Sequence, residues 1–73
     1  MKIDKEDVAE IIQLANYKPL VPFELVGIAL NLCMKYNMKY NIEGVSVATT
    51  GIQLLKKQCL KQFSDEELLE YLI

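Results

Sequence analysis

The chain has 73 residues, of which 52% are hydrophobic, and its formal net charge is −2. All eight basic residues are lysine, and arginine, histidine and tryptophan are absent. The usual side chains for reading bases, for binding phosphates in a bidentate way and for shuttling protons are therefore missing. This composition predicts one domain, residues 1–73, and excludes a zinc site built from cysteine and histidine.

The expected cellular location follows from the N-terminus and the cysteines. The first residues show no apolar segment followed by a cleavage site, as a secreted protein would have. The longest nearly apolar stretch, residues 25–34, is about half the length of a membrane span. Cys33 and Cys59 lie among apolar neighbours in predicted helices. We therefore expect a cytoplasmic protein with no membrane segment and with buried, free thiols.

The first predicted helix covers residues 5–16. Asp4 can cap its first turn, and Ile3 and Val8 occupy the two positions of a hydrophobic staple. One apolar stripe then recurs at helical spacing through Val8, Ile11, Ile12 and Ala15. This stripe predicts that one side of the helix faces the core.

The second predicted helix covers residues 22–40 and is apolar on two sides. One stripe contains Phe23, Val26, Leu30, Met34 and Met38, and the other contains Leu25, Ala29, Leu32 and Tyr36. A helix this apolar must be covered on both sides. We therefore expect it to be the central helix of the fold or part of an oligomer interface.

The end of this second helix is marked by a tandem repeat, MKYN-MKYN, at residues 34–41. Asn37 and Asn41 each suit the left-handed position that ends a helix. Of these two stops we favour the second, with the helix ending near Tyr40.

The third predicted helix covers residues 45–62. Val45, Val47 and Thr49 alternate as in a strand, but the sequence offers no convincing partner strand. A sustained helical spacing favours a helix instead, through Val45, Ala48, Ile52, Leu55, Cys59 and Phe63. Residues 45–50 stay open between helix, strand and loop. Gly27 and Gly51 fall inside predicted helices, where glycine lowers helix stability. We expect that each glycine instead allows another helix to approach closely.

The fourth predicted helix covers residues 65–72. Ser64, followed by Asp65, Glu66 and Glu67, forms a capping box. Leu68, Leu69, Leu72 and Ile73 supply the apolar side. The four helices together predict an all-α fold, a compact four-helix bundle with the second helix at its centre.

Catalytic chemistry is not indicated. Glu6 and Glu10, like Glu66 and Glu70, lie one helical turn apart, and paired carboxylates can bind a metal or exchange protons. Neither pair has the histidine, cysteine or oxygen-rich loop that a metal needs, so we interpret both as solvated faces. We expect no enzyme activity, no cofactor, no metal and no small-molecule substrate.

Lysines concentrate in the middle of the chain. Residues 25–63 hold five lysines and one acid, whereas residues 64–73 hold four acids and no base. A basic face can contact nucleic acid, so the alternative function is a nucleic-acid-associated regulator that uses Lys35, Lys39, Lys56, Lys57 and Lys61. The simpler interpretation is that Lys56, Lys57 and Lys61 lie near a helix C-terminus, where the helix dipole favours cations, and face acidic helices of the same domain.

The MKYN repeat carries the first hypothesis about function. Methionine and tyrosine are enriched in protein interfaces, so we predict partner binding through Met34, Tyr36, Met38 and Tyr40. The alternative, of equal weight, is that these side chains complete the monomer's own core. We expect a small non-enzymatic interaction module, a regulator or inhibitor that binds a partner protein and self-associates, for example as a homodimer.

Overall fold

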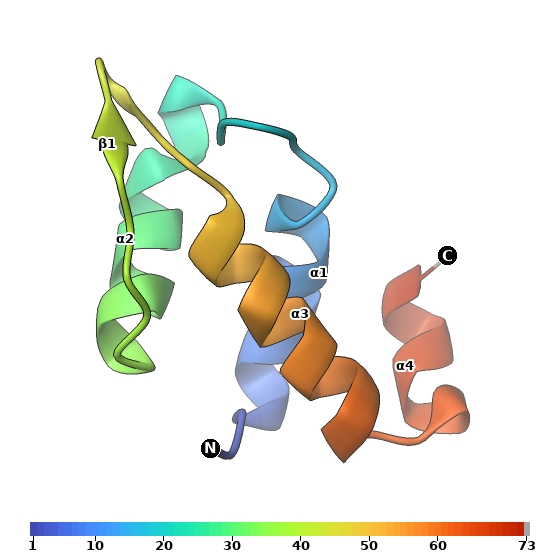
Figure 1. Ribbon diagram of the computed structural model, residues 1–73. Coiled ribbons are helices and arrows are strands. Elements are labelled where there is room, and N and C mark those ends of the chain that lie inside the picture. Colours follow the sequence, from blue (N-terminus) through green and yellow to red (C-terminus); the bar gives the residue numbers. More distant parts are fainter. Residues whose placement is uncertain (73) are drawn as a thin grey trace.

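The computed structural model describes residues 1–72. Its elements are, in chain order, η1 (Lys5–Asp7), α1 (Val8–Leu14), η2 (Phe23–Leu25), α2 (Val26–Lys35), β1 (Ile42–Glu43), β2 (Ser46–Val47), α3 (Thr50–Gln62) and α4 (Asp65–Leu72). Helices cover 61% of the described residues, and a small antiparallel sheet lies between α2 and α3 in sequence (Figure 1). The predicted all-α four-helix bundle is therefore wrong, because the fold is mostly helical but includes a sheet.

The sheet begins as a tight hairpin. β1 and β2 pair antiparallel, with Ile42 opposite Val47 and Glu43 opposite Ser46. The connection starts at Gly44, whose φ of 64° is in the left-handed region that glycine enters at little cost.

A third segment extends this sheet on the far side of β2. The Val21 N–H donates to the Val47 carbonyl at 2.9 Å, and the Thr49 N–H donates to the Pro19 carbonyl at 3.0 Å. These bonds hold residues 46–48 in extended structure, and Thr49 is the N-cap residue of α3, so the predicted helix over residues 45–62 begins only at Thr50.

The second predicted helix, residues 22–40, is shorter than expected. It starts as the 3-10 turn η2 and ends at Lys35. Asn37 has a φ of 55°, and the Met38 N–H donates to the Cys33 carbonyl at 2.7 Å. This left-handed closure is a common way to end a helix, and it shows that the first asparagine of the repeat is the stop.

The packing centre is α1, which contacts α2, α3 and α4. In Figure 1, α2 lies at one edge of the molecule and α4 at the other. The predicted central position of the second helix is therefore wrong. The first predicted helix, residues 5–16, consists of η1 and α1 and ends at Leu14, whereas the fourth, residues 65–72, is confirmed.

The core draws side chains from α1, α2, α3, α4 and the N-terminal segment. Its fully buried members include Ile3, Val8, Ile11, Ile52, Leu55 and Leu68. Cys33 and Cys59 are also buried in it, with free thiols. Within residues 1–72, no helix has both the length and the apolar character needed to cross a membrane.

Candidate functional site

The two sides of α2 have different environments. One side is buried in the core through Ala29, Leu32 and Cys33. On the opposite side, Phe23 in η2 is 65% exposed and Met34 at the end of α2 is 63% exposed. The second apolar side of this helix, which the sequence predicted to be covered, is thus open within the described part of the chain.

The open side forms a continuous surface, which we call the outer α2 stripe: Phe23, Gly27, Leu30 and Met34. These positions recur at spacings of three and four residues, so they share one helix face. Leu30 is half-buried. Gly27 is exposed, with no atom within 4 Å of the place where a Cβ would lie. The stripe therefore has two large apolar ends, and Gly27 adds no side chain between Phe23 and Leu30.

The four residues predicted to bind a partner do not form one surface. Met34 and Tyr40 are 63% and 41% exposed, whereas Tyr36 and Met38 pack against the core. The helix ends within the first half of the repeat, and each half has one exposed residue and one that packs against the core. Sequence reasoning did not single out Phe23 as a surface residue, although its position just after Pro22 marks the start of the helix.

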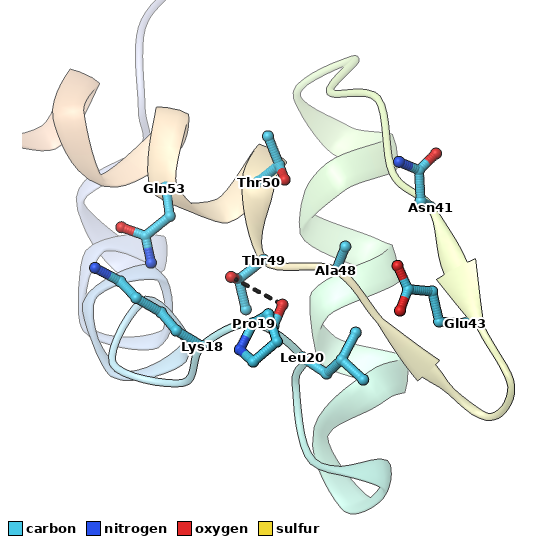
Figure 2. Close-up of a pocket in the computed structure, with 9 residues that line it drawn as sticks. All are labelled: Lys18, Pro19, Leu20, Asn41, Glu43, Ala48, Thr49, Thr50 and Gln53. Carbon is cyan, nitrogen blue, oxygen red and sulfur yellow. Dashed lines mark hydrogen bonds between the residues drawn. The ribbon is translucent and has the colours of Figure 1, made fainter.

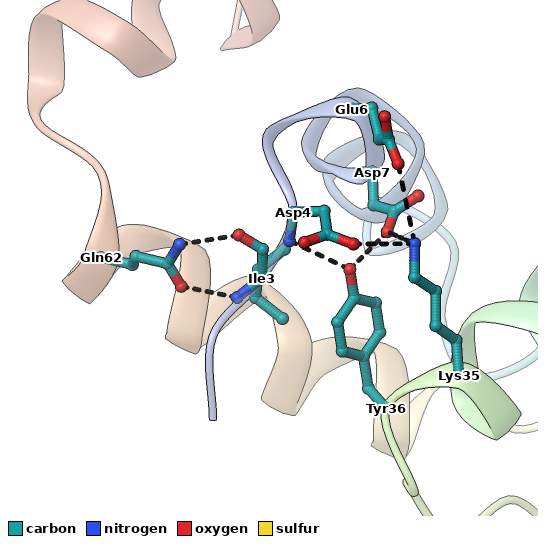
Figure 3. Close-up of polar contacts among 7 residues, drawn as sticks. All are labelled: Ile3, Asp4, Glu6, Asp7, Lys35, Tyr36 and Gln62. Atoms are coloured by element: carbon teal, nitrogen blue, oxygen red, sulfur yellow. Dashed lines mark hydrogen bonds and ion pairs between the residues drawn. The ribbon is translucent and has the colours of Figure 1, made fainter.

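A polar cluster joins the start of α1 to the end of α2 (Figure 3). Lys35 Nζ lies 2.7 Å from Asp7 Oδ2, 3.0 Å from Asp4 Oδ2 and 3.9 Å from Glu6 Oε1. The Tyr36 hydroxyl donates to Asp7 Oδ2 and accepts the Asp4 N–H at 3.1 Å. The cluster therefore fixes the N-terminal segment against α2.

This cluster shifts the proton affinities of its members. Burial raises the pKa of Asp7, but the hydrogen bonds from Lys35 and Tyr36 outweigh it and hold the pKa below the usual value. The hydrogen bonds to Asp7 and Asp4 raise the pKa of Lys35. Burial, followed by the bond to Asp7, raises the pKa of Tyr36. The charge of Lys35 is thus paired with carboxylates of the same chain.

The other lysines of the predicted basic face lie apart from this cluster. Lys39, Lys57 and Lys61 are exposed and Lys56 is half-buried. Across residues 1–72, every ion pair within 4 Å involves Lys35. The α3 lysines therefore form no ion pair within 4 Å among these residues.

Glutamine side chains of α3 form hydrogen bonds with distant backbone groups, which the sequence did not predict. The Gln62 side chain donates from Nε2 to the Ile3 carbonyl and accepts the Ile3 N–H at Oε1, both at 2.7 Å (Figure 3). Gln53 Nε2 donates to the Ala15 carbonyl at 2.6 Å, at the end of α1. No sequence signal separates these residues from ordinary surface glutamines, because their partners are backbone groups far away in the chain.

An open pocket of about 510 Å³ lies over the sheet (Figure 2). Its floor includes Leu20 and Ala48, which form a bridge between neighbouring segments. Lys18 and Glu43 line it with opposite charges, and in Figure 2 the Lys18 side chain extends toward Gln53, away from Glu43. The Thr49 hydroxyl in the pocket wall already donates to the Pro19 carbonyl at 3.2 Å.

Reactive groups do not converge in the described structure. Burial raises the pKa of both cysteine thiols, which disfavours the nucleophilic thiolate. Among residues 1–72, no three His, Cys, Asp or Glu side chains are grouped to hold a metal ion. Comparison with protein-family models, curated proteins and solved structures found no match. Inference about function therefore starts from the surface of the chain itself.

Proposed function

We propose that this chain is a small non-enzymatic protein-binding module, a regulator or inhibitor that acts by binding a partner protein. It also self-associates, through the outer α2 stripe. The observation that carries the proposal is the open apolar side of α2. Phe23 and Met34 expose about two thirds of their surface at its two ends. Contiguous exposed apolar surface is typical of contact sites in small proteins.

The shape of the stripe supports a helical partner. Gly27 leaves space between Phe23 and Leu30, so the backbone of a second helix can approach α2 closely there. A large apolar side chain that becomes fully buried in a contact contributes about 1.5–3 kcal/mol. Phe23 and Met34 would supply such anchors on either side of the crossing point.

The proposed location is the cytoplasm. Cys33 and Cys59 are free and buried, and a raised pKa keeps both thiols protonated. Reduced cysteines of this kind are typical of proteins in reducing compartments. Their burial also supports a binding role over a catalytic one.

The test is self-association of the full chain and of its Met34→Lys variant, measured by sedimentation equilibrium. The new charge must be desolvated for copies to meet at the stripe. We expect the substitution to raise the dissociation constant of self-association at least about tenfold, which corresponds to a loss of about 1.4 kcal/mol in binding free energy. The weight-average mass should fall accordingly.

Leu60→Lys is the matched control, because Leu60 is an exposed apolar residue (49%) on α3, outside the stripe. It should associate as the wild type does. Circular dichroism of both variants checks that the fold is kept. A wild-type chain that stays monomeric at all concentrations, or a Met34→Lys chain that associates like wild type, would contradict the proposal.

A further inference from the structure

Two neighbouring helices carry exposed charges of opposite sign that do not meet. Lys57 and Lys61 are exposed one turn apart on α3, and Glu66 and Glu70 are exposed one turn apart on α4. Only Phe63 and Ser64 separate the two helices in sequence. Nevertheless, all ion pairs within 4 Å in the described part of the chain belong to Lys35. Both charged pairs are therefore available to another molecule.

Each charged pair lies beside an exposed leucine. Leu54 is 50% exposed and shares a face of α3 with Lys57 and Lys61, because the three positions follow spacings of three and four residues. Leu69 is 56% exposed and lies next in sequence to Glu70 on α4. We call these two surfaces the basic α3 face (Leu54, Lys57, Lys61) and the acidic α4 face (Glu66, Leu69, Glu70).

The two faces match in both charge and spacing. Charges four residues apart on a helix are separated by about 6 Å along its axis, and this holds for the lysine pair and for the glutamate pair. Like charges one turn apart repel each other within each helix. Contact with the opposite pair removes that repulsion and covers the two leucines.

We infer that the acidic α4 face of one copy of this chain docks on the basic α3 face of a second copy. Every copy carries both halves of this contact, so no other partner is required. The inference goes beyond the proposed function, because it uses other helices and leaves the outer α2 stripe free.

The test uses two charge-reversed chains, K57E/K61E and E66K/E70K, each made in the Met34→Lys background so that the outer α2 stripe does not contribute. Sedimentation velocity is run at about 50 mM and about 500 mM salt, since salt screens exposed charges. We expect the parent chain to associate at low salt and at least about tenfold more weakly at high salt. Each reversed chain alone should be monomeric.

Mixing supplies the decisive measurement. An equimolar mixture of K57E/K61E and E66K/E70K should associate, because the first chain keeps its acidic α4 face and the second keeps its basic α3 face. The two reversed faces also carry opposite charges. The control is the K18E/K39E chain, also made in the Met34→Lys background, which changes two other exposed lysines and has the same net charge as K57E/K61E. Because this control chain keeps both the basic α3 face and the acidic α4 face, it should associate as the parent chain does, whereas K57E/K61E alone should not.

The possible results separate the two proposals. Failure of the matched mixture to associate, or a K18E/K39E chain that is monomeric like K57E/K61E, would overturn the α3–α4 contact. If Lys57 and Lys61 bind a polyanion and not α4, the E66K/E70K chain will associate to the same extent as the parent chain. That result also overturns the α3–α4 contact. The outer α2 stripe fails on a different result, an unchanged mass for Met34→Lys alone compared with the wild type.

Discussion

At the scale of single residues, the two helical glycines show why spacing alone cannot distinguish their roles. A Cβ at Gly51 would lie 2.8 Å from the Lys39 carbonyl oxygen and 3.2 Å from Met38 Cβ, whereas a Cβ at Gly27 would meet nothing within 4 Å. Another segment therefore approaches closely at Gly51 but not at Gly27, and the two nearest atoms at Gly51 belong to residues 38–39, which follow the end of α2 and are not part of a helix. Both glycines interrupt helical patterns, but only the fold decides which one faces another segment.

This difference predicts opposite effects of alanine at the two sites. Gly51→Ala should destabilise the fold by about 1–3 kcal/mol, because the nearest atom belongs to the backbone and cannot swing away. Gly27→Ala should stabilise it by up to about 1 kcal/mol through helix propensity. Urea denaturation of both variants measures the free energies of unfolding. Equal effects at the two positions would contradict the close approach at Gly51.

At the scale of elements, the parts with local signals were predictable. The capping box before α4 is present, since the Glu67 N–H donates to Ser64 Oγ at 3.3 Å and the Ser64 N–H donates to Glu67 Oε1 at 3.1 Å. Both partners lie within four residues of each other. A signal confined to one turn does not depend on the rest of the fold.

The sheet was not predictable, because its evidence is spread along the chain. β1 has only two residues, too few to show an alternating pattern. The other partner of β2, residues 19–21, is bordered by prolines and gives no strand signal of its own. The helical spacing through Val45 and Ala48 therefore looked stronger than the alternation of Val45, Val47 and Thr49. A strand does form there, but it contains only Ser46 and Val47.

The candidate site was partly predictable for the same reason. Helical spacing identified two apolar sides of the second helix, and the structure shows which one is open. Met34 was selected from the MKYN repeat, but Tyr36 was grouped with it although its hydroxyl contacts Asp7. That contact joins positions 29 residues apart, and composition gives no indication of such a pairing.

The cluster between α1 and α2 predicts how stability depends on pH. The pKa of Asp7 is held below its usual value of 3.8, so its contribution is present above pH 4 and is lost as the pH falls through the lowered pKa. The pKa of Tyr36 is raised above 10.0, so its contribution is present below about pH 10 and is lost as the pH rises further.

Thermal unfolding followed by circular dichroism should therefore give a plateau in melting temperature across the neutral range, with a fall on each side. Asp7→Asn should lower the melting temperature on the plateau and reduce its fall at acid pH. Tyr36→Phe should reduce the fall of the melting temperature at alkaline pH. Glu10→Gln is the control for Asp7→Asn, because Glu10 is an exposed carboxylate on α1 outside the cluster. If Asp7→Asn leaves the fall of the melting temperature at acid pH unchanged, protonation of Asp7 does not affect the stability of the fold.

At the scale of the whole molecule, the two thiols report whether the domain opens as one unit. Cys33 in α2 and Cys59 in α3 are fully buried in the same core. A domain of 73 residues has an expected free energy of unfolding of about 4–11 kcal/mol at typical stability per residue. If thiol reagents reach the cysteines only through global unfolding, both should react about a thousandfold or more slowly than in the denatured chain.

Alkylation under native conditions, resolved for each cysteine by mass spectrometry, measures the two rates separately, and the denatured chain supplies the reference rates. Equal protection of Cys33 and Cys59 is expected, because α2 and α3 pack against each other and share that core. The competing possibility follows from the position of α2 at the edge of the fold with one apolar side open. If α2 detaches on its own, Cys33 will react at least about tenfold faster than Cys59, since local opening costs less free energy than global unfolding. Such a result would make α2 a separately mobile element, and a partner bound to the outer α2 stripe would then slow the reaction of Cys33 more than that of Cys59.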